Sequence, residues 1–217
     1  MKPSFTRLFQ SAVRYTACAR YCNIPEGKIG LCGVRQNIDG KLHLLVYGKV
    51  ITGHVDPIEP VVHYMPGSKI FSIATTGCNW LCHYCQNFDI SQRRKVEGRD
   101  LTPEDIAGLA VSQGCQGLAY TYNQPTIFIE FARDVGLEAR RRGLTNIFVS
   151  NGYDTPEAVA VMGEFLDCII VDFKGNGETE CLRKYVGIPD AGAIFQTIQE
   201  IRDKTKIHIE ITDLVTP

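Results

Sequence analysis

Three cysteines close together in the chain, Cys78, Cys82 and Cys85, have the clearest capacity for chemistry. They are spaced Cys-x3-Cys-x2-Cys in the stretch TGCNWLCHYCQN, and cysteine binds metals as the thiolate. A closed tetrahedral zinc site needs four protein ligands. Three thiolates that hold a [4Fe–4S] cluster instead leave one iron open for a further ligand. The spacing therefore favours an iron–sulfur cluster with an open position.

Two other interpretations of these thiols are open. The i, i+4, i+7 spacing would also place free thiols on one face of a helix, although the segment directly follows a predicted strand. A zinc site with a distant fourth ligand is the other, and that ligand could be His83 or a cysteine at position 18, 22 or 32.

The composition is that of an ordinary globular protein. The 217 residues are 44% hydrophobic and 22% charged, and the net charge is -1, which predicts no attraction to nucleic acid or to a membrane surface. We find no signal peptide and no run of roughly 18 apolar residues that could span a membrane. These features predict a cytoplasmic protein, in which nine cysteines are more often metal ligands or catalysts than disulfides.

Predicted strands and helices alternate from residue 69 onward. The strands are 69–77, 117–124, 146–152, 168–175 and 206–215, and the helices are 102–114, 126–143, 155–166 and 191–205. Thr102 and Thr155 are expected N-caps, each followed by proline, and Gly143 is an expected helix-ending residue. Such alternation is typical of an α/β fold with a parallel sheet.

Five strands and four helices fit either an open doubly wound sheet or part of a (β/α) barrel. We expect an incomplete, TIM-like barrel domain over residues 69–217, truncated after its fifth strand because a barrel would normally continue. Residues 1–68, with short strands broken by glycine and proline, are expected to form a small cysteine-bearing N-terminal appendage.

Polar residues follow every predicted strand. In parallel α/β folds the active site lies at the carboxyl ends of the strands. The residues expected there are Thr75, Thr76, Thr121, Tyr122, Asn123, Gln124, Ser150, Asn151, Asp172, Lys174, Glu210, Thr212 and Asp213. The cysteine motif directly follows the first of these strands, so we expect all of them on one rim. Loop capping is the alternative role for Ser150, Asn151 and Asp172.

Several stretches carry a family resemblance. The cysteine motif, with Tyr84 before its last cysteine, resembles the radical S-adenosylmethionine (SAM) signature. Residues 85–89 resemble glycyl-radical-enzyme activases of the pyruvate formate-lyase activating type. Residues 24–42, 66–79, 119–130 and 171–175 are similar to the AmmeMemoRadiSam-system radical SAM enzyme family.

The resemblance implies an oxidoreductase with two cofactors. Cys78, Cys82 and Cys85 would hold a [4Fe–4S] cluster whose open iron binds SAM, and a 5′-deoxyadenosyl radical from SAM would abstract hydrogen from substrate. Four pairs of residues would contact SAM: Tyr84 and Gln86 at the adenine, Asn123 and Gln124 at the amino group, Ser150 and Asn151 at the ribose, and Asp172 and Lys174 near the sulfonium. Lys174 is also expected to act in catalysis.

The same resemblance indicates partners. It implies a reductant such as flavodoxin or ferredoxin, and a substrate that is a protein if the activase-like neighbourhood is the guide. Memo-like and AMMECR-like proteins are further expected partners. A non-enzymatic iron–sulfur or zinc module that transfers electrons or binds a partner is the competing interpretation.

Two positions depart from the family pattern. Gln124 stands where the family usually has glutamate, and a neutral amide binds an ammonium more weakly than a carboxylate does. Tyr15 stands where relatives have a cysteine, so Cys18, Cys22 and Cys32 form either a three-thiolate second metal site or a structural group. With the early end of the sequence, these departures also fit an inactive relative.

Overall fold

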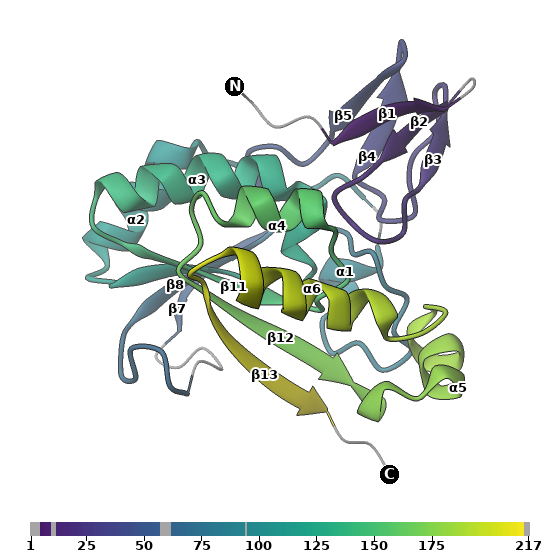
Figure 1. Ribbon diagram of the computed structural model, residues 1–217. Helices are drawn as coiled ribbons and strands as arrows, with labels where there is room; N and C mark the ends of the chain where they lie inside the picture. Colours follow the sequence, from purple (N-terminus) through teal and green to yellow (C-terminus); the bar gives the residue numbers. More distant parts are fainter. Residues whose placement is uncertain (1–4, 10–11, 57–61, 94, 215–217) are drawn as a thin grey trace.

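A six-stranded mixed sheet is the centre of the fold in the computed structural model, which describes residues 5–9, 12–56, 62–93 and 95–214. Its strands, in spatial order, are β13 (His208–Leu214), β12 (Cys168–Lys174), β11 (Thr145–Ser150), β10 (Gly117–Tyr120), β8 (Ile70–Ala74) and β7 (Thr52–Asp56). Strands β8, β10, β11, β12 and β13 are parallel, and β7 pairs antiparallel with β8 at the edge (Figure 1). The predicted α/β fold is confirmed.

The parallel strands follow one another in the sheet as they do in the chain. A doubly wound sheet has a point at which the strand order reverses. Among the described strands no such reversal occurs, which excludes the doubly wound alternative. The carboxyl ends of five successive strands therefore lie along one edge of the sheet, where polar residues were expected.

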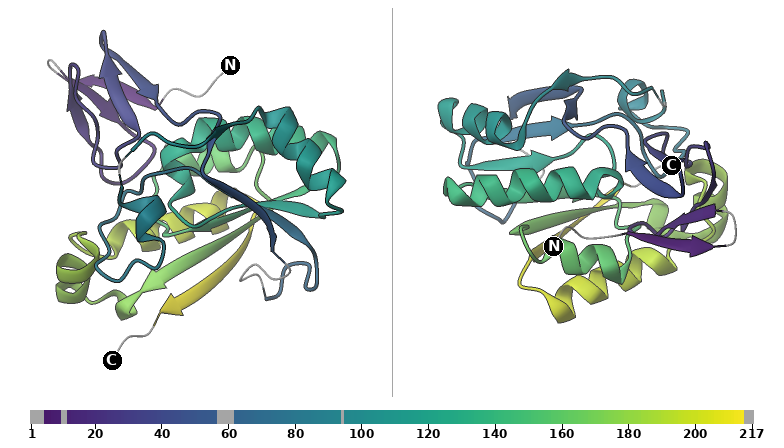
Figure 2. Two further views of the ribbon diagram at one scale, coloured as in Figure 1. Left: turned by 180° about the vertical axis from the view of Figure 1, so that it is seen from behind. Right: turned by 90° about the horizontal axis from the view of Figure 1, so that it is seen from above.

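Four helices connect the strands and cover one face of the sheet (Figures 1 and 2). They are α2 (Pro103–Ser112), α3 (Ile129–Arg141), α4 (Pro156–Met162) and α6 (Gly192–Lys204). Thr102 Oγ1 accepts a hydrogen bond from Asp105 N at 3.1 Å, and Thr155 Oγ1 accepts one from Ala158 N at 3.3 Å, so both predicted N-caps are confirmed. Gly143, with φ +74°, ends α3 as predicted.

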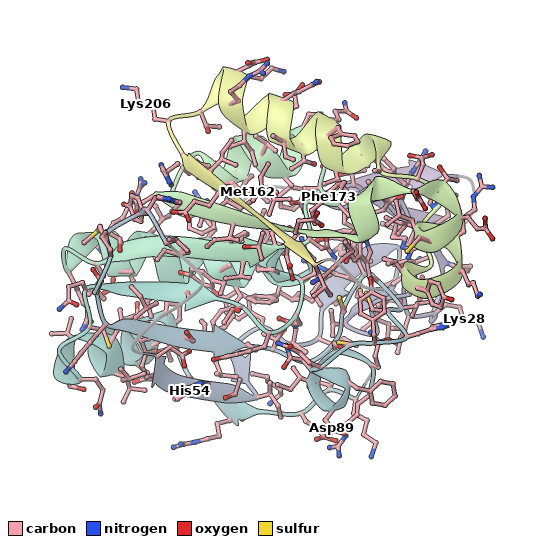
Figure 3. All side chains as sticks on the ribbon, turned by 90° about the horizontal axis from the view of Figure 1, so that it is seen from below. Lys28, His54, Asp89, Met162, Phe173 and Lys206 are labelled. Carbon is pink, nitrogen blue, oxygen red and sulfur yellow. The ribbon has the colours of Figure 1, made fainter. Side chains whose placement is uncertain are left out.

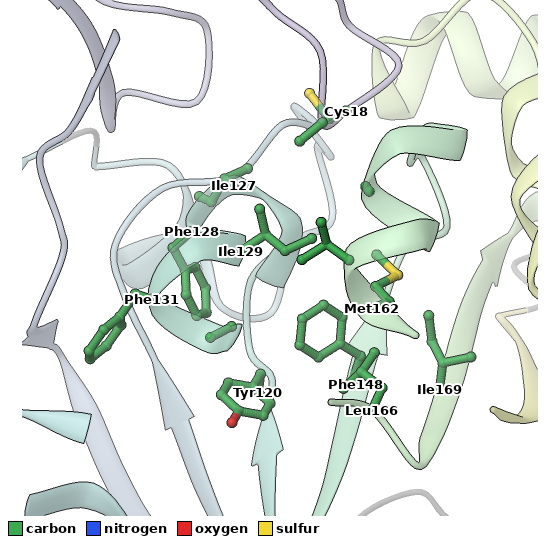
Figure 4. Packing of buried hydrophobic residues seen from close by; sticks show 14 of the residues in the cluster. Cys18, Tyr120, Ile127, Phe128, Ile129, Phe131, Phe148, Met162, Leu166 and Ile169 are labelled. Carbon is green, nitrogen blue, oxygen red and sulfur yellow. The ribbon is translucent and has the colours of Figure 1, made fainter. Parts of the chain in front are cut away.

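Aromatic side chains fill the space between the sheet and these helices (Figure 4). Phe148 lies 5.3 Å from Tyr120 and 5.6 Å from Phe165, measured between ring centroids, and all three are fully buried. The Tyr120 hydroxyl donates to Asn146 Oδ1 at 3.0 Å, so its burial leaves no polar group unpaired. This core fixes the positions of β10 and β11, whose ends carry predicted site residues.

The N-terminal residues form smaller sheets, one of which also contains a strand from residues 99–100. Strands β1 (Thr6–Phe9), β2 (Ala12–Tyr15) and β3 (Asn23–Pro25) make an antiparallel sheet, β4 (Arg35–Ile38) pairs with β5 (Lys41–Leu44), and β6 (Lys49–Val50) pairs with β9 (Arg99–Asp100). The expected boundary at residue 68 would assign β7 to this region, but β7 pairs with β8 over five residues of the main sheet.

Short helical segments complete the fold. They are α1 (Phe88–Ser91), η1 (Pro125–Phe128), η2 (Gly175–Gly177), α5 (Thr179–Cys181) and η3 (Leu182–Val186). Of the helices that the structure describes, none has the length and apolar character to cross a bilayer.

Candidate functional site

A cavity of about 480 Å³ lies at the carboxyl ends of the parallel strands. Its wall brings together every residue that the sequence assigns to the cluster or to SAM: Cys78, Cys82, Cys85, Tyr84, Gln86, Asn123, Gln124, Ser150, Asn151, Asp172 and Lys174. These residues come from the loop after β8 and from the ends of three further strands, β10, β11 and β12, so only the fold makes them neighbours. Their individual roles stay predictions.

The loop that carries the three thiols is held by backbone hydrogen bonds on both sides. Gly77 N donates to Ile90 O at 3.0 Å, which joins the start of the loop to α1, and Leu81 N donates to Val186 O at 3.0 Å, which joins it to η3. Cys85 Sγ lies 3.1 Å from the hydroxyl of Ser91, a buried residue of α1. These contacts hold the cysteine loop against α1 and η3.

Burial controls the protonation of the thiols. It raises the pKa of Cys78 to about 11, and with the neighbouring cysteines it raises the pKa of Cys82 to about 12. Metal binding to these groups must therefore displace protons.

Gly77 allows the loop to approach the N-terminal region. Its φ is +95°, and a Cβ atom at this position would lie 2.4 Å from the carbonyl oxygen of Cys32. No side chain fits there without movement of one of the two backbones. The position of the cysteine loop thus depends on a glycine.

Asn123 and Asn151 tie neighbouring strand ends to the same loop. Asn123 Nδ2 donates to the carbonyl oxygens of Thr75 at 2.7 Å and Gly77 at 2.9 Å. Asn151 Nδ2 donates to Asn79 Oδ1 at 2.8 Å. The Oδ1 atom of Asn123 is buried and accepts no hydrogen bond from any described residue, so the cavity wall contains an acceptor without a partner.

Gln124 is only 1% exposed, and its amide joins three segments of the protein. Nε2 donates to Ser150 Oγ at 2.9 Å and to Asp154 Oδ1 at 3.0 Å, while Oε1 accepts from Asn151 N at 2.8 Å. Both ends of the amide are therefore engaged within the protein. The acceptor without a partner in this part of the cavity wall is therefore Asn123 Oδ1, whereas Gln124 Oε1 is already engaged.

Asp154 is the buried charge of this network, and sequence reasoning missed it. It is 4% exposed, and burial raises its pKa to about 6 against the opposing effect of hydrogen bonds from Thr126, Ser150 and Gln124. A glutamate at position 124 would place a second carboxylate beside this one. The neutral amide of Gln124 instead donates a hydrogen bond to it. The only signal in the sequence is a polar residue shortly after a strand end.

An ion pair lies at the end of β12. Lys174 Nζ is 2.6 Å from Asp172 Oδ2, and both residues are partly buried on the cavity wall. Residues i and i+2 of a strand face the same side, which is why the Asp-x-Lys spacing delivers both side chains to the cavity.

Thr75, Thr76 and Glu210 do not lie on the cavity wall, which corrects the expectation that they join the other polar strand-end residues there. The two threonines directly precede the cysteine loop, and Glu210 lies in β13. Its carboxylate accepts hydrogen bonds from the backbone N–H groups of residues 62–64. Cys168, His208 and Glu210 have ligand atoms within 4.8 Å of one another, but Cys168 is completely buried and the carboxylate is already engaged. This group is better explained as structural.

The N-terminal cysteines lie around a much smaller cavity. Cys18, Cys22 and Cys32 line a space of about 10 Å³. The hydroxyl of Tyr15 donates to Thr126 O at 2.7 Å and is thus engaged away from the thiols. Burial raises the pKa of both Cys18 and Cys32. The three side chains thus share one small space, with room for about one water molecule.

The fold and the site define a class: an α/β protein with sequential parallel strands and three thiols after the first of them. The model of the radical SAM superfamily matches residues 72–215, and the chain belongs to that superfamily. The uncharacterized protein MJ0808 of Methanocaldococcus jannaschii is 36% identical over 217 residues. That match covers 98% of this chain and 63% of MJ0808, so the chain spans less than two thirds of that relative.

Two solved structures are also similar. TYW1 with a bound lysine–pyruvate adduct matches at a TM-score of 0.45 and 16% identity, covering 66% of this chain and 54% of TYW1. QueE from Escherichia coli matches at a TM-score of 0.42 and 13% identity, covering 77% of this chain and 82% of QueE. Both likenesses are distant.

Enzymes of the radical SAM superfamily use a [4Fe–4S] cluster and S-adenosylmethionine. The residues present fit both groups. Three free thiols line the cavity, and the buried Oδ1 of Asn123 offers an acceptor to which no described residue donates. The cavity of about 480 Å³ lies within the roughly 300–1,000 Å³ of small-molecule sites.

Proposed function

We propose that this chain carries the catalytic domain of an enzyme that cleaves SAM reductively and abstracts hydrogen from a substrate. The observation that carries the proposal is the convergence of the residues predicted for the cluster and for SAM on one cavity. We also interpret the five sequential parallel strands as part of a TIM-like barrel, with the N-terminal residues as an appendage. The strand order supports this interpretation.

The proposed roles follow from position. Cys78, Cys82 and Cys85 would hold the cluster, which supplies the electron that splits the sulfonium carbon–sulfur bond of SAM. Asn123 would accept from the methionine ammonium through its buried Oδ1. The paired Lys174 and Asp172 would orient charged groups of SAM from the end of β12.

The remaining predicted residues would complete the SAM site. Ser150 and Asn151, at the end of β11, are proposed for the ribose, and Tyr84 and Gln86, in the cysteine loop, for the adenine. Enclosure of these groups in one cavity would limit the access of water to the reacting atoms.

The substrate and partners are proposed on the sequence resemblance. The stretches similar to the AmmeMemoRadiSam-system family and to glycyl-radical-enzyme activases support a protein substrate, with Memo-like and AMMECR-like partners. A flavodoxin or ferredoxin would supply the electron. These proposals concern the activity of a whole protein, since the chain spans only 63% of MJ0808.

The test is anaerobic production of 5′-deoxyadenosine. The protein is reconstituted with iron and sulfide, reduced with dithionite and given SAM, and the product is measured by chromatography. Cys82→Ala should abolish both the cluster spectrum and the product. Cys115→Ala, which removes a buried thiol outside the cavity, is the matched control and should retain both.

The outcomes separate the candidate functions. Product in wild type and in Cys115→Ala, with none in Cys82→Ala, supports the proposal. A [4Fe–4S] spectrum without product would identify an inactive relative or an electron-transfer module. Absence of any cluster would contradict the proposal and favour zinc.

A further inference from the structure

Tyr122 adopts an unusual backbone conformation at the edge of the cavity. It lies just after β10, and its φ is +64°, in the left-handed region that residues with a side chain rarely adopt. Such a conformation persists where the surrounding contacts fix it, and such residues cluster at functional sites. The contacts of the Tyr122 side chain therefore show which part of the protein holds this conformation.

Those contacts come from β7, the antiparallel edge strand. The Tyr122 hydroxyl donates to Asp56 Oδ2 at 2.6 Å and lies 2.7 Å from His54 Nε2. His54 Nε2 is 3.0 Å from Asp56 Oδ1, and the rings of His54 and Tyr122 stack with centroids 5.4 Å apart. Figure 3 labels His54 on its strand. Strand β7 precedes residues 72–215, so both of these contacts come from outside the matched family region.

The turn that Tyr122 creates delivers the next residue to the cysteine loop. Asn123 N donates to Thr121 O at 2.8 Å, which closes a tight turn around Tyr122. The Asn123 side chain then reaches the carbonyl oxygens of Thr75 and Gly77, immediately before Cys78. Tyr122 therefore directly precedes the residue whose side chain is bonded to the start of the cysteine loop.

We propose that Tyr122 is a positioning residue whose side chain fastens the turn of residues 121–124 to β7. Asp56 and His54 hold the phenol, the phenol holds the left-handed turn, and the turn sets Asn123 Oδ1 for the ammonium of SAM. The effect on SAM rests on the proposed function. The fastening of the turn does not, and the two are measured separately.

The variant Tyr122→Phe keeps the ring and its stacking but removes the hydroxyl. Tyr47→Phe is the matched control, because Tyr47 also donates to a carboxylate, Asp134 Oδ2 at 2.7 Å, but does so outside the cavity. Asp56→Asn is the conservative variant, since its amide oxygen can still accept from the phenol.

Hydrogen exchange tests the fastening of the turn. We expect the backbone amides of residues 121–124 to exchange about tenfold faster in Tyr122→Phe, which loses a hydrogen bond to a charged acceptor. Asp56→Asn should give a smaller increase, and Tyr47→Phe none in this segment. Exchange in Tyr122→Phe equal to that in wild type would overturn the proposal.

Equilibrium dialysis of SAM against the reconstituted protein tests the consequence. We expect the dissociation constant to rise about tenfold in Tyr122→Phe and to stay unchanged in Tyr47→Phe, with equal iron content in both. Unchanged SAM affinity in Tyr122→Phe would refute the positioning of Asn123. If wild type itself bound no SAM, the proposed function would fail, and the exchange measurement would still decide the fastening of the turn.

Discussion

At the scale of single residues, the site combines reactive side chains on the cavity wall with a network of buried polar groups. The thiols, Asp172 and Lys174 line the cavity directly, while Gln124 joins strand ends through the carboxylate of Asp154. A buried carboxylate is tolerated here because Thr126, Ser150 and Gln124 all donate to it. The Asp154 carboxylate is thus fully hydrogen-bonded, but a second charged group beside it would be unfavourable.

The pH dependence of stability should report on Asp154. Burial raises its pKa in the folded protein to about 6, above its value in the unfolded chain, so protonation favours folding. This contribution is fully present below about pH 4 and is lost as the pH rises through about 6. Relative to Asp154→Asn, wild type should lose about 3 kcal/mol of unfolding free energy between pH 4 and pH 8.

Urea unfolding across this range makes the measurement. Asp89→Asn, a change at an exposed carboxylate of α1, serves as the control and should run parallel to wild type. A constant difference between wild type and Asp154→Asn at all pH values would contradict the assignment of the buried charge.

The residues that could be predicted at this scale are those whose local spacing carries the signal. Cys-x3-Cys-x2-Cys, Asp-x-Lys and most of the polar strand ends placed residues on the cavity wall. Asp154 and the role of Tyr122 could not be found this way. Their environments depend on contacts between segments far apart in sequence, such as β7 with the turn after β10.

At the scale of elements, the cysteine loop is positioned by what lies on either side of it. Its start packs against the backbone of the N-terminal region at Gly77, and its middle is bonded to η3. The helix caps at Thr102 and Thr155 could be predicted from local sequence, because a capping threonine followed by proline is a local signal. The place of β7 in the main sheet could not be predicted, because strand pairing across the intervening residues leaves no local pattern.

Substitution of Gly77 should disturb both folding and cluster binding. In Gly77→Ala the new methyl group would meet Cys32 O in a backbone conformation that already disfavours a side chain. We expect a loss of more than about 2 kcal/mol in unfolding free energy, and less iron bound per chain after reconstitution. Both quantities are measured on the same preparation.

Gly114→Ala is the control that measures the cost of a left-handed backbone conformation without a steric clash. Gly114 has φ +70°, but a Cβ atom at this position would meet nothing within 4 Å. This variant should lose about 1–2 kcal/mol and keep its full iron content. Equal losses of unfolding free energy in Gly77→Ala and Gly114→Ala would show that the close approach of Gly77 to Cys32 O adds no further cost.

At the scale of the whole molecule, an ion pair between a buried arginine and a partly buried glutamate joins the N-terminal region to the main sheet domain. Arg35 is 2% exposed, and its guanidinium bonds to both carboxylate oxygens of Glu130 in α3. Its Nε donates to Ile127 O at 2.8 Å, and Nη2 donates to the hydroxyl of Tyr15 at 3.1 Å. The sequence showed only an arginine in a short strand, so this link could not be anticipated.

Loss of this pair should loosen the N-terminal region as a unit. Arg35→Met leaves Glu130 and Ile127 O without their partner. Removal of one member of a fully buried pair costs about 3–5 kcal/mol, and we expect the lower end of this range because Glu130 is 23% exposed. Lys49→Met breaks the surface pair with Asp100, which is 82% exposed, and should cost less than about 1 kcal/mol. Urea unfolding gives both values, and limited proteolysis should cleave residues 1–50 faster in Arg35→Met alone. Because the same region contacts the cysteine loop at Gly77, Arg35→Met should also bind less iron per chain. Equal free energies of unfolding in Arg35→Met and Lys49→Met would show that the Arg35–Glu130 pair does not hold the two regions together.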